Sequence, residues 1–215
     1  TGRREFTGYW EYLLENAIFT SPPHPNFAGA ALIGPDGSLL GIGSLFVGDA
    51  LAGEIRLPGN MFIPIDRLKP ILPDLLATGH SAKPARPWLG LFTEEVSSHL
   101  FIAATIPDGP SAQAGLKPGD IILGVGDKTV SSQAEFYRAV WAQGDAGVEI
   151  PLKILRQSQM QTLSVRSLDR DQYFQQNQSP GAPHRNTPSR PETVQAPAGS
   201  PLKITACMNS TNSAC

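Results

Sequence analysis

The segment PSAQAGLKPGDIIL at residues 110–123 limits the folds open to this chain more than any other stretch of its sequence. Ser111 can cap one turn of helix, and Gly115 can end that turn because glycine adopts the left-handed backbone region without strain. Gly119 and Asp120 form a turn into the apolar run Ile-Ile-Leu, which is typical of a buried strand. The segment therefore predicts a small module in which strands pack against short helices.

The residues that follow this segment predict a second helix and further strands. Residues 132–143 fit a helix that begins at Ser131 or Ser132 and carries Glu135 in its first turn, where a negative charge is favoured. Two segments of alternating polarity are expected to follow as strands, at residues 148–155 and 161–167.

The first part of the chain predicts a hairpin followed by a helix. Residues 31–47 read as strand, turn and strand, with the sequence Gly-Pro-Asp-Gly supplying the reversal. Residues 65–76 carry apolar side chains at helical spacing, with Asp66 as N-cap, Gly79 just after the end, and prolines that make the start irregular. Residues 6–19 fit either a short helix or a buried strand, and we favour the strand.

Changes in composition divide the chain into parts. Glycine and prolines interrupt the apolar periodicity before residue 88 and predict a linker. Beyond Phe174 no aromatic residue occurs, so the end of the chain cannot bury enough apolar area to offset its ordering entropy. A docked strand at residues 202–204 is the alternative for this tail. The predicted parts are a first domain at residues 1–79, a linker at 80–87, a second domain at 88–170 and a disordered tail at 171–215.

Charge and cysteine content argue against several classes of function. The 17 basic and 19 acidic residues give a net charge of −2, without the basic excess typical of nucleic-acid binding. No apolar run approaches the roughly 20 residues that a membrane-spanning helix needs. The only cysteines, Cys207 and Cys215, lie in the predicted tail and cannot staple a core. The chain opens with Thr-Gly-Arg-Arg, so we expect a fragment or a processed product.

The segment at residues 111–123 resembles the corresponding part of the PDZ domains attached to HtrA/DegP-type serine proteases. Residues 86–91, Arg-Pro-Trp-Leu-Gly-Leu, resemble the carboxylate-binding loop of those proteins, and residues 61–72 resemble the strand and helix that end their protease domain. The resemblance covers about residues 18–168. It implies a mainly β fold with a few helices, in which the C-terminal part of a trypsin-like β-barrel precedes a PDZ domain and a disordered tail.

The resemblance implies a peptide-binding groove. A PDZ domain adds an extended peptide to a sheet edge, while backbone N–H groups of a loop hold the terminal carboxylate. Gly90 permits close backbone approach, and Phe136 with Val140 would form the opposite helical wall unless they are ordinary core residues. Residues 93–100 are fewer than the family usually has there, which predicts a shallower or differently bounded groove. The residues assigned to peptide binding are Trp88, Leu89, Gly90, Leu91, Phe92, Thr93, Phe136 and Val140.

The position of a protease nucleophile holds no serine. Laid against the family pattern Gly-Asn-Ser-Gly-Gly-Pro-Leu, residues 26–32 place Ala28 where the serine would attack. Asn26 replaces a glycine that helps to shape the oxyanion turn, and His24 is a lone histidine in a proline-rich loop, typical of a solvated residue. We therefore assign no catalytic residue and regard Ala28 as a vestigial position. The other serines and histidines that we considered and set aside are Ser21, Ser38, Ser44, His80, His99 and His184.

The sequence predicts a binding protein, a degenerate HtrA-like pseudoprotease fragment. Its expected partners are C-terminal or extended peptide segments of proteins, with a homo-oligomer as a further option, and no cofactor, metal or nucleic acid is expected. The alternatives are a serine endopeptidase active in its full-length form and a structural self-association module. HtrA-like proteins work mostly in the bacterial periplasm, and this resemblance alone indicates that localisation.

Overall fold

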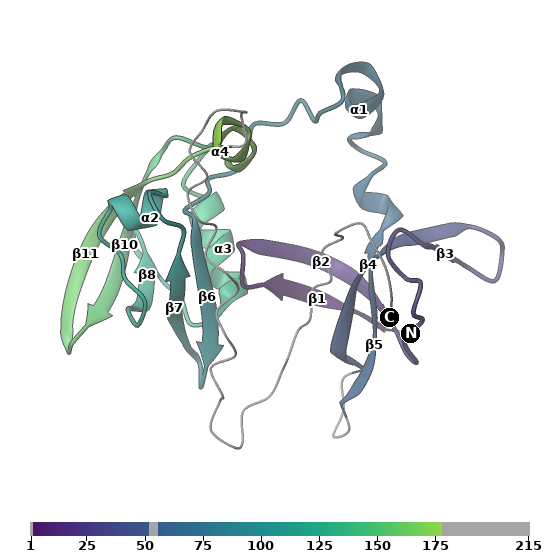
Figure 1. Cartoon of the computed structure of the whole chain (residues 1–215), viewed down its shortest axis with the longest axis horizontal. Helices are drawn as coiled ribbons and strands as arrows, with labels where there is room; N and C mark the ends of the chain where they lie inside the picture. Colours follow the sequence, from purple (N-terminus) through teal and green to yellow (C-terminus); the bar gives the residue numbers. More distant parts are fainter. Residues whose placement is uncertain (1, 52–55, 178–215) are drawn as a thin grey trace. The chain divides into compact units, whose positions relative to one another are not determined.

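The strands of the computed structural model, which describes residues 2–51 and 56–177, fall into two separate sheets (Figure 1). Residues 2–6 and 14–82 belong to one unit, and residues 7–13 and 83–177 belong to a second. Strands account for more of the described chain than helices do, so the mainly β fold class predicted from the sequence is confirmed.

The first unit is built on a five-stranded sheet with the order β1-β2-β5-β4-β3. The strands are β1 (Gly2–Gly8), β2 (Tyr12–Thr20), β3 (Ala31–Ile33), β4 (Leu39–Leu51) and β5 (Leu57–Pro64). Between β3 and β4 the chain reverses at Gly37, whose amide donates to the Gly34 carbonyl at 3.0 Å. This reversal confirms the strand, turn and strand predicted for residues 31–47.

The segment at residues 6–19 forms parts of two strands, where the sequence favoured one. β1 ends and β2 begins within it, so residues 9–11 form a turn. Glu11 takes a left-handed conformation with φ 59°. The reversal escaped prediction because Gly8 lies before the turn and the turn residues 9–11 include no glycine or asparagine, which are the usual signal of a tight hairpin. Residues 8–11, called the hairpin tip below, belong to the second unit.

Two short helices follow β5: the 3₁₀ helix η1 (Ile65–Arg67) and the helix α1 (Leu72–Thr78). The single helix predicted for residues 65–76 is interrupted because Pro70 lacks the N–H that a continuous helix needs there. Asp66 is not a cap, and its carboxylate accepts a hydrogen bond from the Lys69 ammonium at 2.8 Å. The prediction that Gly79 ends the helix is confirmed by its φ of 78°.

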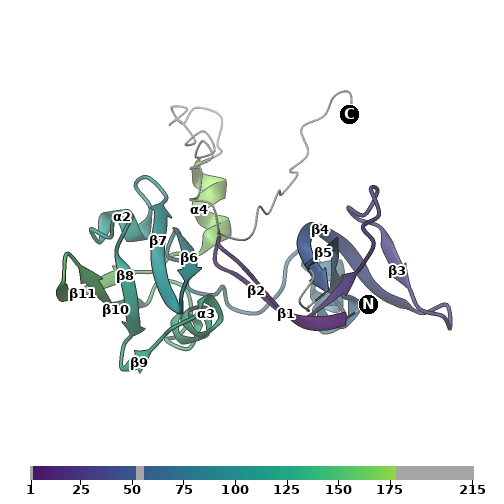
Figure 2. The same cartoon turned by 90° about the horizontal axis from the view of Figure 1, so that it is seen from below.

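The second unit carries a sheet with the order β11-β10-β8-β7-β6, and β9 pairs with β8. Its strands are β6 (Leu91–Val96), β7 (His99–Thr105), β8 (Ile121–Val125), β9 (Lys128–Thr129), β10 (Glu149–Arg156) and β11 (Gln159–Arg166). Its helices are α2 (Pro110–Gln113), α3 (Gln133–Trp141) and α4 (Arg170–Asn177). Helix α3 packs against β6 and β8 (Figure 2), and the shared core includes Leu100, Ile122 and Leu152, each almost fully buried.

The sequence predicted a serine N-cap for two helices. The prediction is confirmed for α3, where Ser132 is the cap, and is wrong for α2, where Ser111 is not. Ser132 is the N-cap of α3, and its hydroxyl accepts from the Glu135 amide at 3.2 Å. The Glu135 carboxylate accepts in return from the Ser131 amide at 2.8 Å, which completes a reciprocal cap. Helix α2 begins after Gly109 without a side-chain cap, because Ser111 lies inside the helix.

Helix α4 occupies the start of the segment that the sequence predicts as a disordered tail. Tyr173 and Phe174 contact Trp88, with ring centroids 4.9 and 5.5 Å away. These aromatic contacts supply apolar burial that stabilises the segment, so the tail prediction is wrong for residues 171–177. The remainder of that prediction, including the alternative strand at residues 202–204, lies outside the described residues.

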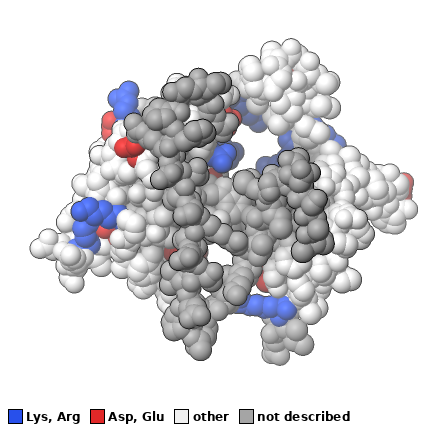
Figure 3. Space-filling model, viewed as in Figure 1, with Lys and Arg blue, Asp and Glu red and all other residues white. Residues whose placement is uncertain are grey.

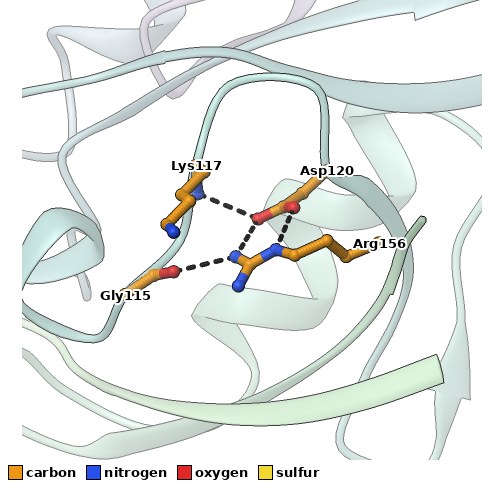
Figure 4. A network of polar contacts seen from close by, with 4 residues as sticks. All are labelled: Gly115, Lys117, Asp120 and Arg156. Atoms are coloured by element: carbon orange, nitrogen blue, oxygen red, sulfur yellow. Dashed lines mark hydrogen bonds and ion pairs between the residues drawn. The ribbon is translucent and has the colours of Figure 1, made fainter. Parts of the chain in front are cut away.

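A buried ion pair joins the segment between α2 and β8 to β10 (Figure 4). Asp120, which is 2% exposed, accepts two hydrogen bonds from the Arg156 guanidinium at 2.6 and 2.7 Å and one from the Lys117 amide at 2.8 Å. The same guanidinium donates to the Gly115 carbonyl at 2.8 Å. Desolvation of Asp120 raises the pKa of its carboxyl, but the hydrogen bonds and charge of Arg156 and the Lys117 amide outweigh it, so the pKa is lowered.

We predict that Arg156→Met lowers the free energy of unfolding at neutral pH by about 3 kcal/mol, because it leaves the Asp120 carboxylate buried without its counter-charge. Since the folded pKa of Asp120 is depressed, this stability is present above the ordinary aspartate pKa of about 3.9 and is lost as the pH falls through the folded value. Urea denaturation at a series of pH values measures both effects.

The matched control is Arg166→Met, because Arg166 faces Glu149 at 3.9 Å with both side chains more than half exposed. It should change the stability by no more than about 0.5 kcal/mol. Equal losses in the two variants, or a loss for Arg156→Met that does not shrink in acid, would contradict the assignment.

Candidate functional site

The loop at residues 88–91, called the carboxylate loop below, has a backbone conformation that depends on one glycine. Gly90 has φ 70°, a region that residues with a side chain rarely adopt. A Cβ at this position would lie 3.2 Å from the Pro110 ring and 3.2 Å from the Trp88 ring. The chain can therefore make this turn in so little space because position 90 lacks a side chain.

Backbone hydrogen bonds fix the carbonyl groups of the carboxylate loop. The Leu89 carbonyl accepts from the Ser111 amide at 2.9 Å, and the Gly90 carbonyl accepts from the Ile106 amide at 2.8 Å. Ser111 belongs to the segment at residues 110–123, so that segment supports this loop directly. With their carbonyls bound on one side, the residues of the loop have N–H groups left for another acceptor.

That acceptor is the side chain of Glu11 at the hairpin tip. One carboxylate oxygen accepts from the amides of Gly90 and Leu91 at 2.7 and 3.1 Å, and the other accepts from the amide of Leu89 at 2.9 Å. Three successive N–H groups therefore converge on one carboxylate. Hydrogen bonds to an ionised acceptor are about twice as strong as neutral ones, so this loop is built to hold a carboxylate group.

Two features of Glu11 show what this contact costs. Desolvation raises the pKa of its carboxyl to about 7, although the three loop amides and the charge of Arg170 act in the opposite direction. Its left-handed backbone, with φ 59°, costs on the order of 1 kcal/mol for a residue other than glycine. A partly buried acid in a disfavoured conformation persists because the surrounding contacts hold it there.

The backbone of the hairpin tip also bonds to the edge of the sheet. Strand β6 is the edge strand, and its Thr93 amide donates to the Tyr9 carbonyl at 3.1 Å. The Tyr137 hydroxyl on α3 donates to the Gly8 carbonyl at 2.8 Å. The rings of Tyr9 and Phe92 lie 5.8 Å apart. The main chain of the tip therefore bonds to the backbone of β6 and to the Tyr137 side chain of α3, in addition to the carboxylate contact of Glu11.

The residues assigned to peptide binding divide into two groups. Gly90, with the amides of its neighbours, faces the carboxylate, and Phe92 and Thr93 lie beside the hairpin tip. The others are core residues: Trp88, Leu89, Leu91, Phe136 and Val140 are each at most 5% exposed. For Phe136 and Val140 the core is the alternative that the sequence left open.

Sequence reasoning missed the side chains that provide the polar contacts. Glu11 lies about eighty residues before the loop that it contacts, and no local pattern signals such a distant partner. Gln133 and Tyr137 are one helical turn apart on α3, and their side chains both bond Thr93, at 2.8 and 3.1 Å. A search of this helix for polar groups beside Phe136 could have found them.

Residues 93–100, the segment that the sequence analysis described as short, run from β6 into β7. The two strands are joined at Ser97 and Ser98, both with positive φ, in a tight hairpin turn. The short segment at residues 93–100 is fully used by the strands and this turn, which leaves no room for an additional helical turn.

The turn at residues 26–30 in the first unit is held by its backbone. The Gly29 amide donates to the Gly43 carbonyl at 2.9 Å, and the Gly43 amide donates to the Ala30 carbonyl at 2.8 Å. A Cβ at Gly43 would lie only 1.8 Å from the Phe27 carbonyl oxygen, so the strand must carry glycine there. Ala28, the position that the sequence analysis compared with a protease nucleophile, is exposed on this turn.

His24, just before this turn along the chain, helps to fix the backbone of the turn. The His24 ring accepts from the Asn26 amide at 3.2 Å, and its own amide donates to the buried Asn60 side chain at 2.6 Å. Across residues 2–51 and 56–177, no three acidic, histidine or cysteine side chains gather as metal ligands would. Within the same ranges, none of the helices has the length and apolarity to cross a membrane.

Acidic and basic side chains are interspersed on the described part of the face shown in Figure 3. This distribution agrees with the net charge of −2.

Comparison with known proteins places these features in a family context. The PDZ domain family matches residues 87–166. The chain is 30% identical over 154 residues to a probable periplasmic serine endoprotease, DegP-like, of Halomonas elongata, a match that covers 66% of this chain and 31% of the relative. It is 26% identical over 160 residues to the serine protease Do-like HtrA of Bacillus subtilis, covering 66% of this chain and 34% of the relative.

A solved structure, that of the serine endoprotease from Yersinia pestis, matches with 27% identity and a TM-score of 0.46, over 72% of this chain and 52% of that chain. The chain spans about a third of the length of the two curated relatives. Residues 87–166 therefore match the PDZ domain family, and the chain is similar to serine proteases of the HtrA/DegP type.

Proposed function

We propose that this protein binds protein segments that end in a free carboxylate, through the carboxylate loop and the edge of β6. The observation that carries the proposal is the convergence of the Leu89, Gly90 and Leu91 amides on one carboxylate. A terminal carboxylate has the same geometry and charge as the side-chain carboxylate found there. The rest of such a peptide would extend along β6, whose Thr93 amide already donates to a carbonyl.

Peptide binding and not proteolysis is the proposed activity of this chain. Acyl transfer by a trypsin-like site needs a nucleophile, a positioned base and oxyanion donors. Ala28 supplies no nucleophile, and the nearest histidine along the chain, His24, bonds the Asn26 amide. The DegP-like relatives are named as periplasmic proteins, and we propose the periplasm for this protein on that ground.

We predict that a short peptide ending in leucine with a free carboxylate binds the full chain with micromolar affinity, near −8 kcal/mol. C-terminal amidation should weaken binding at least about tenfold, because it removes the charge that the three amides accept. Isothermal titration with the two forms of one peptide measures the difference. Equal affinities would refute the carboxylate-loop assignment.

We predict that Ala28→Ser does not create a protease. A serine hydroxyl is a poor nucleophile until a base accepts its proton, and such help is typically worth about 10²–10⁴ in rate. Wild type and variant should both fail to turn over a fluorogenic peptide or to react with a fluorophosphonate label. Labelling of the variant alone would mean that the chain holds a working base, and the binding-only proposal would fall.

A further inference from the structure

The hairpin tip occupies the place that the proposed function gives to a peptide. Its Glu11 carboxylate accepts from the amides of Leu89, Gly90 and Leu91 in the carboxylate loop, at 2.7 to 3.1 Å. Its Tyr9 carbonyl takes the Thr93 amide of the edge strand. A ligand peptide would need these same donors, so tip and peptide cannot be bound together.

We propose that residues 8–11 are an internal ligand of the PDZ domain, in which the Glu11 side chain stands in for a C-terminal carboxylate and an external peptide binds by displacing the tip. The proposal rests on the proposed function, because it concerns the same groove. It adds that the groove is closed by the chain itself and opens in competition with partners.

The contacts along the tip fit a bound ligand better than an incidental turn. The tip bonds the loop through a side chain, the edge strand through Tyr9 and α3 through Gly8. Leu13, just beyond the tip, packs against the apolar core of the second unit. The tip thus combines a carboxylate, main-chain hydrogen bonds and an apolar contact, which are the elements of extended-peptide recognition.

The tip competes well because it is part of the same chain. A tethered segment presents its carboxylate at an effective concentration of the order of millimolar, without the entropy cost of bringing two molecules together. Two properties of Glu11 weaken docking of the tip: its backbone has a positive φ, and its carboxylate is desolvated. An internal ligand of this kind holds the groove closed and still yields to a partner of sufficient affinity.

The test compares the wild-type chain with Glu11→Gln, which keeps the size of the side chain and replaces one of its two acceptor oxygens with an NH₂ group that cannot accept a hydrogen bond. The matched control is Glu15→Gln on the same hairpin, whose side chain is exposed and pairs with Arg67. Binding of a fluorescent leucine-ended peptide is measured with a free and an amidated terminus. Backbone amide resonances of Leu89, Gly90 and Leu91 are recorded in the absence of peptide.

We expect Glu11→Gln to bind the free-acid peptide about tenfold more tightly than wild type and Glu15→Gln, and to move the three amide resonances. If the variants bind with equal affinity and still prefer the free acid, the internal ligand is refuted and the proposed function stands. If none of the three proteins binds the free acid, the proposed function fails. The internal contact is then judged by the resonances alone: their movement in Glu11→Gln supports it, and unchanged positions overturn it.

The pH dependence gives an independent readout. Burial raises the pKa of Glu11 from 4.5 to about 7, so docking of the tip takes up a proton between these values and weakens as the pH rises through 7. Arg170 on α4 acts in the opposite direction on Glu11, and Tyr137 on α3, whose pKa is raised to about 12, stays neutral. A peptide C-terminus, with a pKa of about 3.5, stays charged throughout.

The affinity of wild type for the free-acid peptide should therefore increase severalfold between pH 5.5 and pH 8, whereas that of Glu11→Gln should stay constant. The Glu15→Gln control should follow wild type. The same pH profile in wild type and Glu11→Gln would contradict displacement of a titrating internal carboxylate.

Discussion

The arrangement of the second unit depends on three backbone N–H groups that must point at one place. Consecutive amides in a strand point to alternate sides, so their convergence requires a local change of backbone conformation. Gly90 provides it with a φ of 70° in a position where any Cβ would press against Pro110 and Trp88. No other residue type combines that backbone with that lack of volume, and the carboxylate site follows from this one position.

The remainder of the unit keeps this loop in place. Its carbonyls are bound by the amides of Ile106 and Ser111, on the chain just before α2 and within it. The segment after α2 is anchored in turn by the buried pair of Asp120 and Arg156. Below the loop, Leu89 and Leu91 enter the core with the residues of α3. Their burial supplies stability, and their backbone supplies the site, so one short stretch serves both purposes.

The sequence predicted the parts of this fold that local chemistry decides. The cap of α3, the end of α1 at Gly79 and the hairpin before β4 follow from residue types within a few positions of each other. Predictions failed where a distant contact decides. Tyr173 and Phe174 order α4 because they meet Trp88, and Glu11 holds a turn because it meets residues 89–91. The polar side chains of the candidate site were not predicted either. A search for apolar periodicity on α3 selects Phe136 and does not select its neighbour Tyr137.

On the proposal above, the carboxylate loop is a receptor for carboxylate groups, and Glu11 fills it in the free protein. Hydrogen exchange of the Gly90 amide tests it most directly. We expect slow exchange of this amide in the wild-type chain, fast exchange in Glu11→Ala, and renewed protection of that variant by a free-acid peptide but not by the amidated peptide. Equal exchange in wild type and variant, or equal protection by the two peptides, would contradict it.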